Sequence, residues 1–156
     1  MKLRLVAVGK VKEKYFTEAI NEYSKRLSGY CDFSIVEVKE ENYKNPSQAE
    51  IKKILAIEGE RIEKAVKGYV IVLAIEGKKI TSEEFAQKIK TLTDRGEGEI
   101  TFVIGGSYGV DERIKCLAKE KVSFSGMTFP HTLMRVITAE QLYRAFSINA
   151  GSEYHK

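Results

Sequence analysis

Apolar residues follow two alternating patterns along the chain. Short apolar runs predict buried strands, and the alternation of apolar and polar residues at 33–38 predicts a half-exposed strand. Apolar residues at every third or fourth position between the strands predict helices with one buried face. The predicted strands are 3–8, 33–38, 69–75, 100–104 and 122–125, and the predicted helices are 16–27, 51–66, 81–92, 111–120 and 130–148. This alternation predicts an α/β fold, a mostly parallel sheet with helices on both faces.

Local signals refine these boundaries. Thr81 and Glu84 have the spacing of a capping box, and the segment 76–79 (EGKK) is expected to stop the third strand. No linker or repeat divides the chain, so residues 1–156 are expected to form a single domain. In open parallel sheets, ligands bind beyond the carboxyl ends of the strands. The segments after Ile75, Ile104 and Ser125 are therefore the candidate site.

Composition narrows the class of protein. With 156 residues, 43% hydrophobic and 31% charged, the chain is long enough for its own core. Cys31 and Cys116 belong to no CxxC pair, which predicts a reduced, cytoplasmic setting without disulfides. The two histidines and two cysteines have no zinc-binding spacing, so no metal is expected, and metal-dependent and covalent hydrolytic mechanisms are disfavoured. No apolar run approaches about 20 residues and the first residues do not form a signal peptide, so no membrane association is expected.

Positive charge is concentrated near the N-terminus. Residues 2–28 contain seven Lys/Arg and three Glu, which equals the net charge of +4 of the whole chain. Lys10, Lys12 and Lys14 lie in this segment and are candidates for contacts with phosphates. A solvated helix face with many lysines is the alternative interpretation.

The first candidate for chemistry is the glycine-rich turn 105–109 (GGSYG). Glycines leave room for a ligand against the backbone and permit positive φ. The spacing matches neither a dinucleotide-binding fingerprint nor a P-loop, so an ordinary tight turn remains an alternative.

The second candidate is the uncharged segment 122–134, which contains SFSGMTFPH at 123–131. Backbone polar groups beside Phe and Met side chains suit the adenine and ribose of a cofactor better than a phosphate. A buried connection between a strand and a helix would have the same composition.

The third candidate is the C-terminal helix with its tail. Glu140 and Arg144 are spaced i,i+4 and are able to pair with each other. The tail Tyr154–Lys156 combines groups that stack on bases, accept protons and pair with phosphates. Frayed, inert termini are the common alternative.

Taken together, these segments resemble the ribosomal large-subunit methyltransferase H family, small members of the SPOUT class of knotted RNA methyltransferases. The matching segments are 3–10 (LRLVAVGK), 12–15 (KEKY), 58–61 (EGER), Leu73 with 77–78 (GK), 102–109 (FVIGGSYG), 123–131 (SFSGMTFPH), Arg135, 139–145 (AEQLYRA) and 153–156 (EYHK). The resemblance implies S-adenosylmethionine-dependent methylation of N3 of a pseudouridine in large-subunit (23S) rRNA. It also implies a C-terminal trefoil knot, a homodimer and a substrate within the ribosome.

The resemblance also implies roles for individual residues. The implied cofactor-binding residues are Leu73, Gly105, Phe124, Ser125, Gly126, Met127, Thr128 and Phe129. Family members often have an acid after the position of Leu73, where this chain has Ala74. We expect Tyr154 and His155 to reach the target base from the partner subunit, with His155 or solvent accepting its proton. Arg144 is expected to belong to the catalytic group with Tyr154 and His155 and to hold an RNA phosphate or the flipped nucleotide. Arg135 and Lys156 are expected to contact RNA.

Two other classes remain as alternatives. A non-enzymatic RNA-binding module would share the basic N-terminus but would not need an uncharged cofactor loop. A nucleotide-binding enzyme of the flavodoxin or dinucleotide type would need phosphate-binding glycines after the first strand. The sequence there is Gly9-Lys10-Val11-Lys12, which argues against that class.

Overall fold

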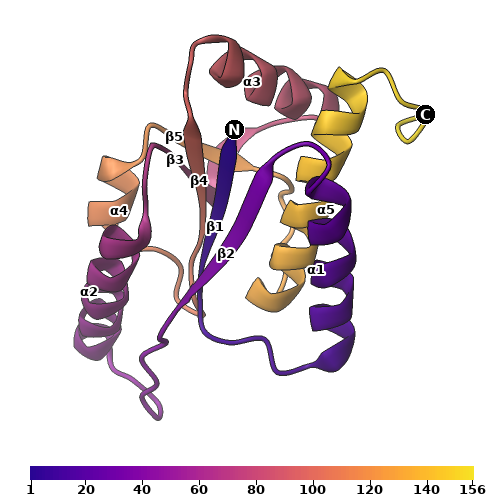
Figure 1. The fold of residues 1–156 in the computed structure, drawn as a ribbon. Coiled ribbons are helices and arrows are strands. Elements are labelled where there is room, and N and C mark those ends of the chain that lie inside the picture. Colours follow the sequence, from indigo (N-terminus) through magenta and orange to yellow (C-terminus); the bar gives the residue numbers. More distant parts are fainter.

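A computed structural model describes all 156 residues and shows a five-stranded sheet (Figure 1). The strands are β1 (Lys2–Val8), β2 (Asp32–Val38), β3 (Tyr69–Lys79), β4 (Glu99–Ile104) and β5 (Glu120–Ser123). They pair in the order β2-β1-β4-β3-β5, and every pair is parallel. All strands therefore present their carboxyl ends at the same edge of the sheet.

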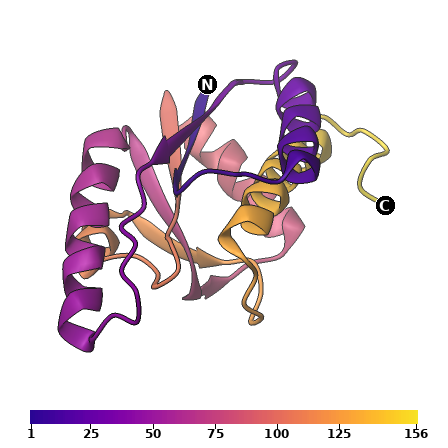
Figure 2. The same ribbon diagram turned by 90° about the horizontal axis from the view of Figure 1, so that it is seen from below.

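Helices cover both faces of the sheet, as the alternating pattern predicted (Figure 2). They are α1 (Lys14–Leu27), α2 (Gln48–Ala65), α3 (Ser82–Asp94), α4 (Glu112–Leu117) and α5 (His131–Asn149). Helices α1, α3 and α5 contribute to the core on one face, and α2 and α4 contribute to the core on the other. The predicted α/β class is confirmed.

The two faces of the sheet have different side chains. In β1, Leu3 and Leu5 point to the core beneath α1, α3 and α5, whereas Val6 and Val8 point to the core beneath α2 and α4. The same division holds in β4, where Phe102 lies in the first core and Val103 in the second. Because neighbouring residues in a strand point to opposite faces, a slip of one residue would exchange the large and small side chains.

Three predicted boundaries are wrong. The strand predicted at 122–125 is β5, which spans Glu120–Ser123. The helix predicted at 111–120 is limited to Glu112–Leu117, because the chain is already extended at Ala118 and enters β5 at Glu120. The third strand does not stop at 76–79: β3 continues to Lys79 with a shift in register, so Leu73 and Lys78 both pair with Val122.

Gly77 explains the continuation of β3. A Cβ at this position would lie 2.7 Å from backbone atoms of Lys121 and Val122 in β5. Only glycine permits this close approach of two backbones. The capping box of α3 is present as predicted, because the Thr81 and Glu84 side chains each accept a hydrogen bond from the other's backbone N–H.

None of the helices combines the length and apolar composition required to cross a membrane. The C-terminal trefoil knot that the resemblance implies remains a prediction.

Candidate active site

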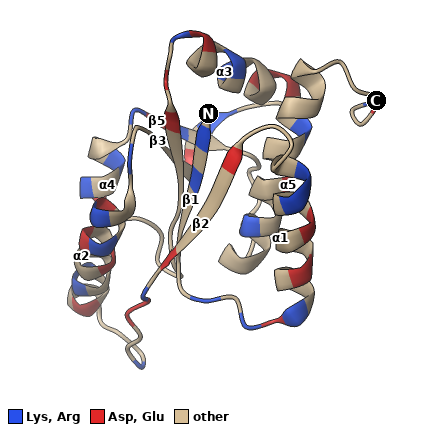
Figure 3. Ribbon diagram, viewed as in Figure 1, with Lys and Arg blue, Asp and Glu red and all other residues tan.

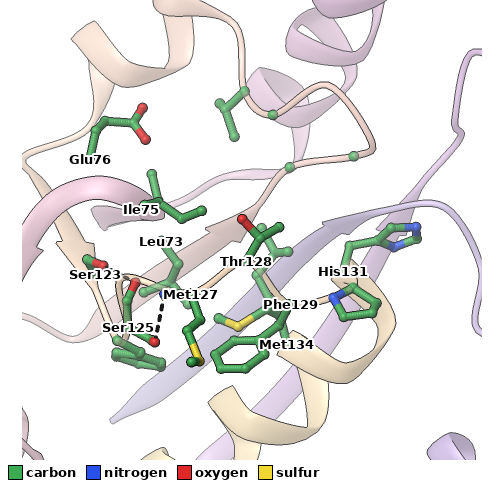
Figure 4. Close-up of a pocket in the computed structure, with 18 of the residues that line it drawn as sticks. Leu73, Ile75, Glu76, Ser123, Ser125, Met127, Thr128, Phe129, His131 and Met134 are labelled. Atoms are coloured by element: carbon green, nitrogen blue, oxygen red, sulfur yellow. Dashed lines mark hydrogen bonds between the residues drawn. The ribbon is translucent and has the colours of Figure 1, made fainter.

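A cavity of about 770 Å³ opens at the carboxyl ends of β4 and β5, beside the part of β3 where the register shifts (Figure 4). Its walls come from 73–76, 104–110, Lys115, 122–125 and 127–131, with Met134 from α5. All three segments that the sequence analysis singled out by their position after strands therefore meet at one site. The volume lies within the usual range of small-molecule sites, roughly 300–1,000 Å³.

The expected cofactor residues are nearly all in this cavity. Of the expected cofactor residues, those that line the cavity are Leu73, Gly105, Phe124, Ser125, Met127, Thr128 and Phe129. Gly126 belongs to the same loop but does not line the cavity. The sequence analysis missed the contributions of Ile75 and Lys115, and it did not assign His131 and Met134 to the cofactor although both lie in the uncharged segment 122–134.

One wall is built from the backbone of the glycine-rich turn. A Cβ on Gly105 would overlap the carbonyl group of Gly109, and one on Gly106 would lie 3.1 Å from the Val8 side chain. The Gly109 N–H donates to the Gly106 carbonyl at 3.1 Å, and Gly109 has a φ of +89°. The turn therefore requires glycine and leaves this wall without side chains at 105 and 106.

The opposite wall is the uncharged loop after β5. The Ser123 hydroxyl donates to the Ser125 carbonyl at 2.8 Å, and the Ser125 hydroxyl accepts from the Met127 N–H at 2.9 Å (Figure 4). Within the chain, the backbone groups of Gly126, Thr128 and Phe129 make no hydrogen bond. Their N–H and carbonyl groups are therefore available to a ligand.

The ion pair at the cavity joins Lys115 to Glu76 at 2.6 Å. The hydrogen bond from Lys115 lowers the pKa of Glu76, and the same contact raises the pKa of Lys115. Both groups are therefore charged at neutral pH and largely compensate each other.

His131 is the histidine of the cavity. It begins α5, and its Nδ1 atom is buried without a hydrogen-bond partner. Its Cε1 atom lies 3.7 Å from the position that a Cβ on Gly9 would occupy, so the imidazole is beside the β1–α1 connection. Its position directly after the uncharged loop was the available sequence signal.

The C-terminal tail lies on its own subunit, away from the cavity. The Tyr154 hydroxyl donates to Glu140 at 3.0 Å, and the Arg144 guanidinium is 4.7 Å from the centre of the Tyr154 ring. His155 contacts Arg144 through Nδ1 at 3.1 Å and Glu83 through Nε2 at 2.9 Å. Burial and the hydrogen bond to Glu140 raise the pKa of Tyr154, so its phenol is neutral at physiological pH.

No residue after Met134 lines the cavity. Glu140, where the tail docks, is nine residues along α5 from His131, a helical rise of about 13 Å. The residues expected to be catalytic, Tyr154, His155 and Arg144, are therefore together with one another but not with the cavity of the same chain.

The placement of Arg135 does not fit the expected RNA contact. Its side chain is 1% exposed and pairs with Glu37 at 2.6 Å. It also donates to the backbone carbonyls of Val8 at 2.8 Å and Gly9 at 3.0 Å. A guanidinium with these internal partners holds the β1–α1 connection and is not presented to an RNA phosphate.

Lys10, Lys12 and Lys14 lie in that connection or at the start of α1, where Figure 3 shows a concentration of basic residues. All three are exposed, and Lys14 lies 3.8 Å from Glu18 in an exposed ion pair. Lys10 and Lys12 have no ion pair within the chain. Because the connection follows β1, these lysines lie at the same edge of the sheet as the cavity.

The chain has no group of three or more His, Cys, Asp or Glu residues placed to hold a metal ion.

A parallel sheet with a cavity at its carboxyl edge, lined by backbone, apolar side chains and one ion pair, is typical of α/β proteins that bind small organic molecules. Two solved structures share the fold. The first is a "probable methylase family protein" from Haemophilus influenzae, with a TM-score of 0.56 and 16% sequence identity, and the comparison covers 99% of this chain and 70% of that one. The second is the tRNA (m1G37) methyltransferase of Aquifex aeolicus, with a TM-score of 0.50 and 14% identity, and the comparison covers 92% of this chain and 70% of that one.

Sequence comparison assigns the family. Residues 1–155 match the model described as "Predicted SPOUT methyltransferase", and the chain belongs to the SPOUT methyltransferase family. It is 51% identical to the Ribosomal RNA large subunit methyltransferase H of Leuconostoc mesenteroides over 159 residues, and 54% identical to that of Bifidobacterium adolescentis over 161 residues. Each comparison covers 100% of both chains.

Proposed function

We propose that this methyltransferase uses S-adenosylmethionine to methylate N3 of a pseudouridine in large-subunit rRNA, acting on the ribosome in the cytoplasm. The names of its full-length relatives support rRNA as the substrate. The observation that carries the proposal is the cavity at the carboxyl edge of the sheet, where the glycine-rich turn and the uncharged loop face each other.

The residues at this site fit S-adenosylmethionine. The free backbone groups at Thr128 and Phe129 suit the edge of an adenine, and Leu73 and Phe124 offer apolar surface for its faces. The turn at Gly105 leaves room for the ribose or the amino-acid portion. The cofactor would supply an activated methyl group on a sulfonium.

The chemistry requires orientation and loss of one proton. Methylation requires N3 to lose its proton to a base or to solvent. It also requires the residues of the site to hold N3 in line with the methyl group that the bound cofactor would supply. Holding nucleophile and methyl in line contributes up to about 7–11 kcal/mol. The protein must therefore present the flipped base to the open side of the cavity and provide a path for the proton.

The position of the tail supports a site shared between two subunits. Within one chain, Tyr154 and His155 are remote from the cavity. In a homodimer, the tail of one subunit would cover the target base over the cofactor of the other, with Arg144 holding the nucleotide. Lys10, Lys12 and Lys156 would hold phosphates of the rRNA.

The direct test is transfer of labelled methyl from S-adenosylmethionine to ribosomes that lack the modification, followed by mapping of the modified nucleotide. We expect label at N3 of one pseudouridine of the large-subunit rRNA. Absence of label in ribosomes, subunits and free rRNA would refute the proposed function.

Subunit mixing tests the shared site. A variant lacking 153–156 and a Gly105→Ala variant should each be inactive. After subunit exchange, half of the dimers are mixed and each has one complete site, so about one quarter of wild-type activity should return. No recovery, with exchange verified by mass spectrometry, would contradict a site built from two subunits.

A further inference from the structure

Three lysines lie at the sheet edge that β5 forms beside the cavity: Lys78 and Lys79 of β3 and Lys121 of β5. We call them the β5-edge lysines. β5 is the outermost strand of the sheet, so one of its sides has no neighbouring strand. All three side chains are exposed.

The register shift in β3 places these lysines next to the cofactor loop. After the shift, Lys78 pairs with Val122 and Lys79 with Ser123, the last residue of β5 before the loop. The Lys79 ammonium lies 3.5 Å from the position that a Cβ on Gly126 would occupy. Its charge therefore lies against the outer side of the loop whose inner side lines the cavity.

The charge of the β5-edge lysines is not neutralised by ion pairs. None of the three pairs with a carboxylate. The carboxylates on the same two strands, Glu76 of β3 and Glu120 of β5, already have other partners. Glu76 pairs with Lys115 at 2.6 Å, and Glu120 pairs with Lys88 and accepts from the Tyr69 hydroxyl at 2.7 Å. The edge therefore keeps a surplus of positive charge.

The positive surface continues along α3. A groove of about 350 Å³ begins at Lys78 and is lined also by Lys88 and Arg95, with the polar side chains of Gln87 and Thr91 between them. Glu120 also lines the groove and pairs with Lys88, so the unpaired positive charge there comes from Lys78 and Arg95. Arg95 makes no ion pair, and the groove carboxylate Glu84 is held in the capping box of α3. These donors and cations suit phosphate and ribose groups.

We propose that the β5-edge lysines hold the phosphates of the rRNA strand that flanks the nucleotide entering the cavity, and that this strand continues along the groove beside α3. The inference rests on the proposed function, because it assumes an RNA substrate. Lys10 and Lys12 lie in the β1–α1 connection at the carboxyl edge of the sheet, and they would then contact another part of the RNA. A protein strand is a poorer occupant, because β5 has only four residues and lysines on an edge disfavour strand addition.

The test compares two triple variants of equal charge. The first is Lys78→Gln/Lys79→Gln/Lys121→Gln. The control is Lys44→Gln/Lys52→Gln/Lys53→Gln, which changes three exposed, unpaired lysines in and just before α2. The substrate is the ribosome lacking the modification. The readouts are kcat/KM for methyl transfer, ribosome affinity as a function of salt, and affinity for S-adenosylhomocysteine by calorimetry.

We expect the first variant to bind ribosomes about ten- to hundredfold more weakly at 150 mM salt, with its salt slope reduced by about 2–3, because three phosphate contacts are lost. Its affinity for S-adenosylhomocysteine should stay within twofold of wild type, as should every readout for the control. Equal ribosome affinity and salt slope in both variants would overturn the inference. The same result accompanied by self-association of the first variant would assign the lysines to protection of the edge instead. Failure of the wild-type protein to methylate ribosomes would refute the proposed function itself and is recognised separately.

Discussion

Replacing Glu37 with alanine should destabilise the fold far more than the loss of a half-exposed carboxylate usually does. Its partner Arg135 is 1% exposed, while the Glu37 side chain is 40% exposed. The alanine variant leaves a buried guanidinium whose remaining partners are the carbonyls of Val8 and Gly9. Glu37 also accepts the Val11 N–H at 3.1 Å, so the variant releases part of the β1–α1 connection as well.

The magnitude follows from which partner is buried. Removing one member of a buried ion pair costs about 3–5 kcal/mol, and partial access of water to the vacated site lowers this to about 2–4 kcal/mol. Arg135→Met removes the buried charge but leaves two buried carbonyls without donors, at about 1–3 kcal/mol each. In that background Glu37 is accessible to water, so adding Glu37→Ala should cost little more. The coupling energy between the two sites should then be about 2–4 kcal/mol.

Urea unfolding of the wild type, both single variants and the double variant measures this coupling. Glu18→Ala is the matched control, because Glu18 pairs with Lys14 at 3.8 Å on an exposed helix face and should cost less than about 1 kcal/mol. The reasoning fails if Glu37→Ala costs no more than the control, or if the two single losses add up in the double variant.

Three further outcomes are expected. Gly105→Ala should weaken S-adenosylhomocysteine binding at least about tenfold, because its Cβ overlaps the turn. Gly126→Ala should bind within about threefold of wild type, because its Cβ meets only the flexible end of Lys79. Equal losses of affinity in both variants, measured by calorimetry, would contradict the role of the turn. Burial raises the pKa of Cys31 to about 11 from 9.0, so at pH 8 it should have roughly a hundredfold less thiolate than a thiol with the ordinary pKa. Because Cys31 is also less accessible than the exposed Cys116, it should be alkylated more slowly, as followed by mass spectrometry; equal rates would show that Cys31 is not shielded. Burial raises the pKa of Glu58, so its ionised carboxylate lowers the stability of the fold above that folded-state pKa. Glu58→Gln should therefore be more stable than wild type at pH 7 and should lose this advantage below about pH 4. A stability difference in urea unfolding that does not change with pH would refute this.

The fold was largely predictable because β1, β3 and β4 contain apolar runs, β2 alternates apolar with polar residues, and each long helix has a periodic apolar face. The misplaced boundaries depend on contacts between segments distant in sequence. The continuation of β3 requires Gly77 to meet the backbone of β5, more than 40 residues later, and no local pattern encodes that contact. The short α4 ends because the chain must reach β5, which again is a requirement of the sheet.

The site was predictable in outline, because ligand-binding segments follow strands in parallel sheets. Arg135 shows where residue type misled the prediction. It lies three and seven residues before the buried Thr138 and Leu142, so its position belongs to the buried stripe of α5, although its charge suggested RNA. The docking of the tail was not predictable, because it depends on Glu83 and Glu140 from two different helices.

The walls of the cavity come from segments that are separate in sequence and meet only after β1 has paired with β4, nearly a hundred residues away. Such long-range parallel pairing forms slowly during folding. A partly folded chain therefore has no binding site, and a cofactor that occupies the cavity selects the fully assembled sheet. Its binding free energy adds to folding stability, by about 2.7 kcal/mol when its concentration is a hundred times the Kd. For a newly synthesised chain, the methyl donor is thus also a ligand that favours completion of the fold.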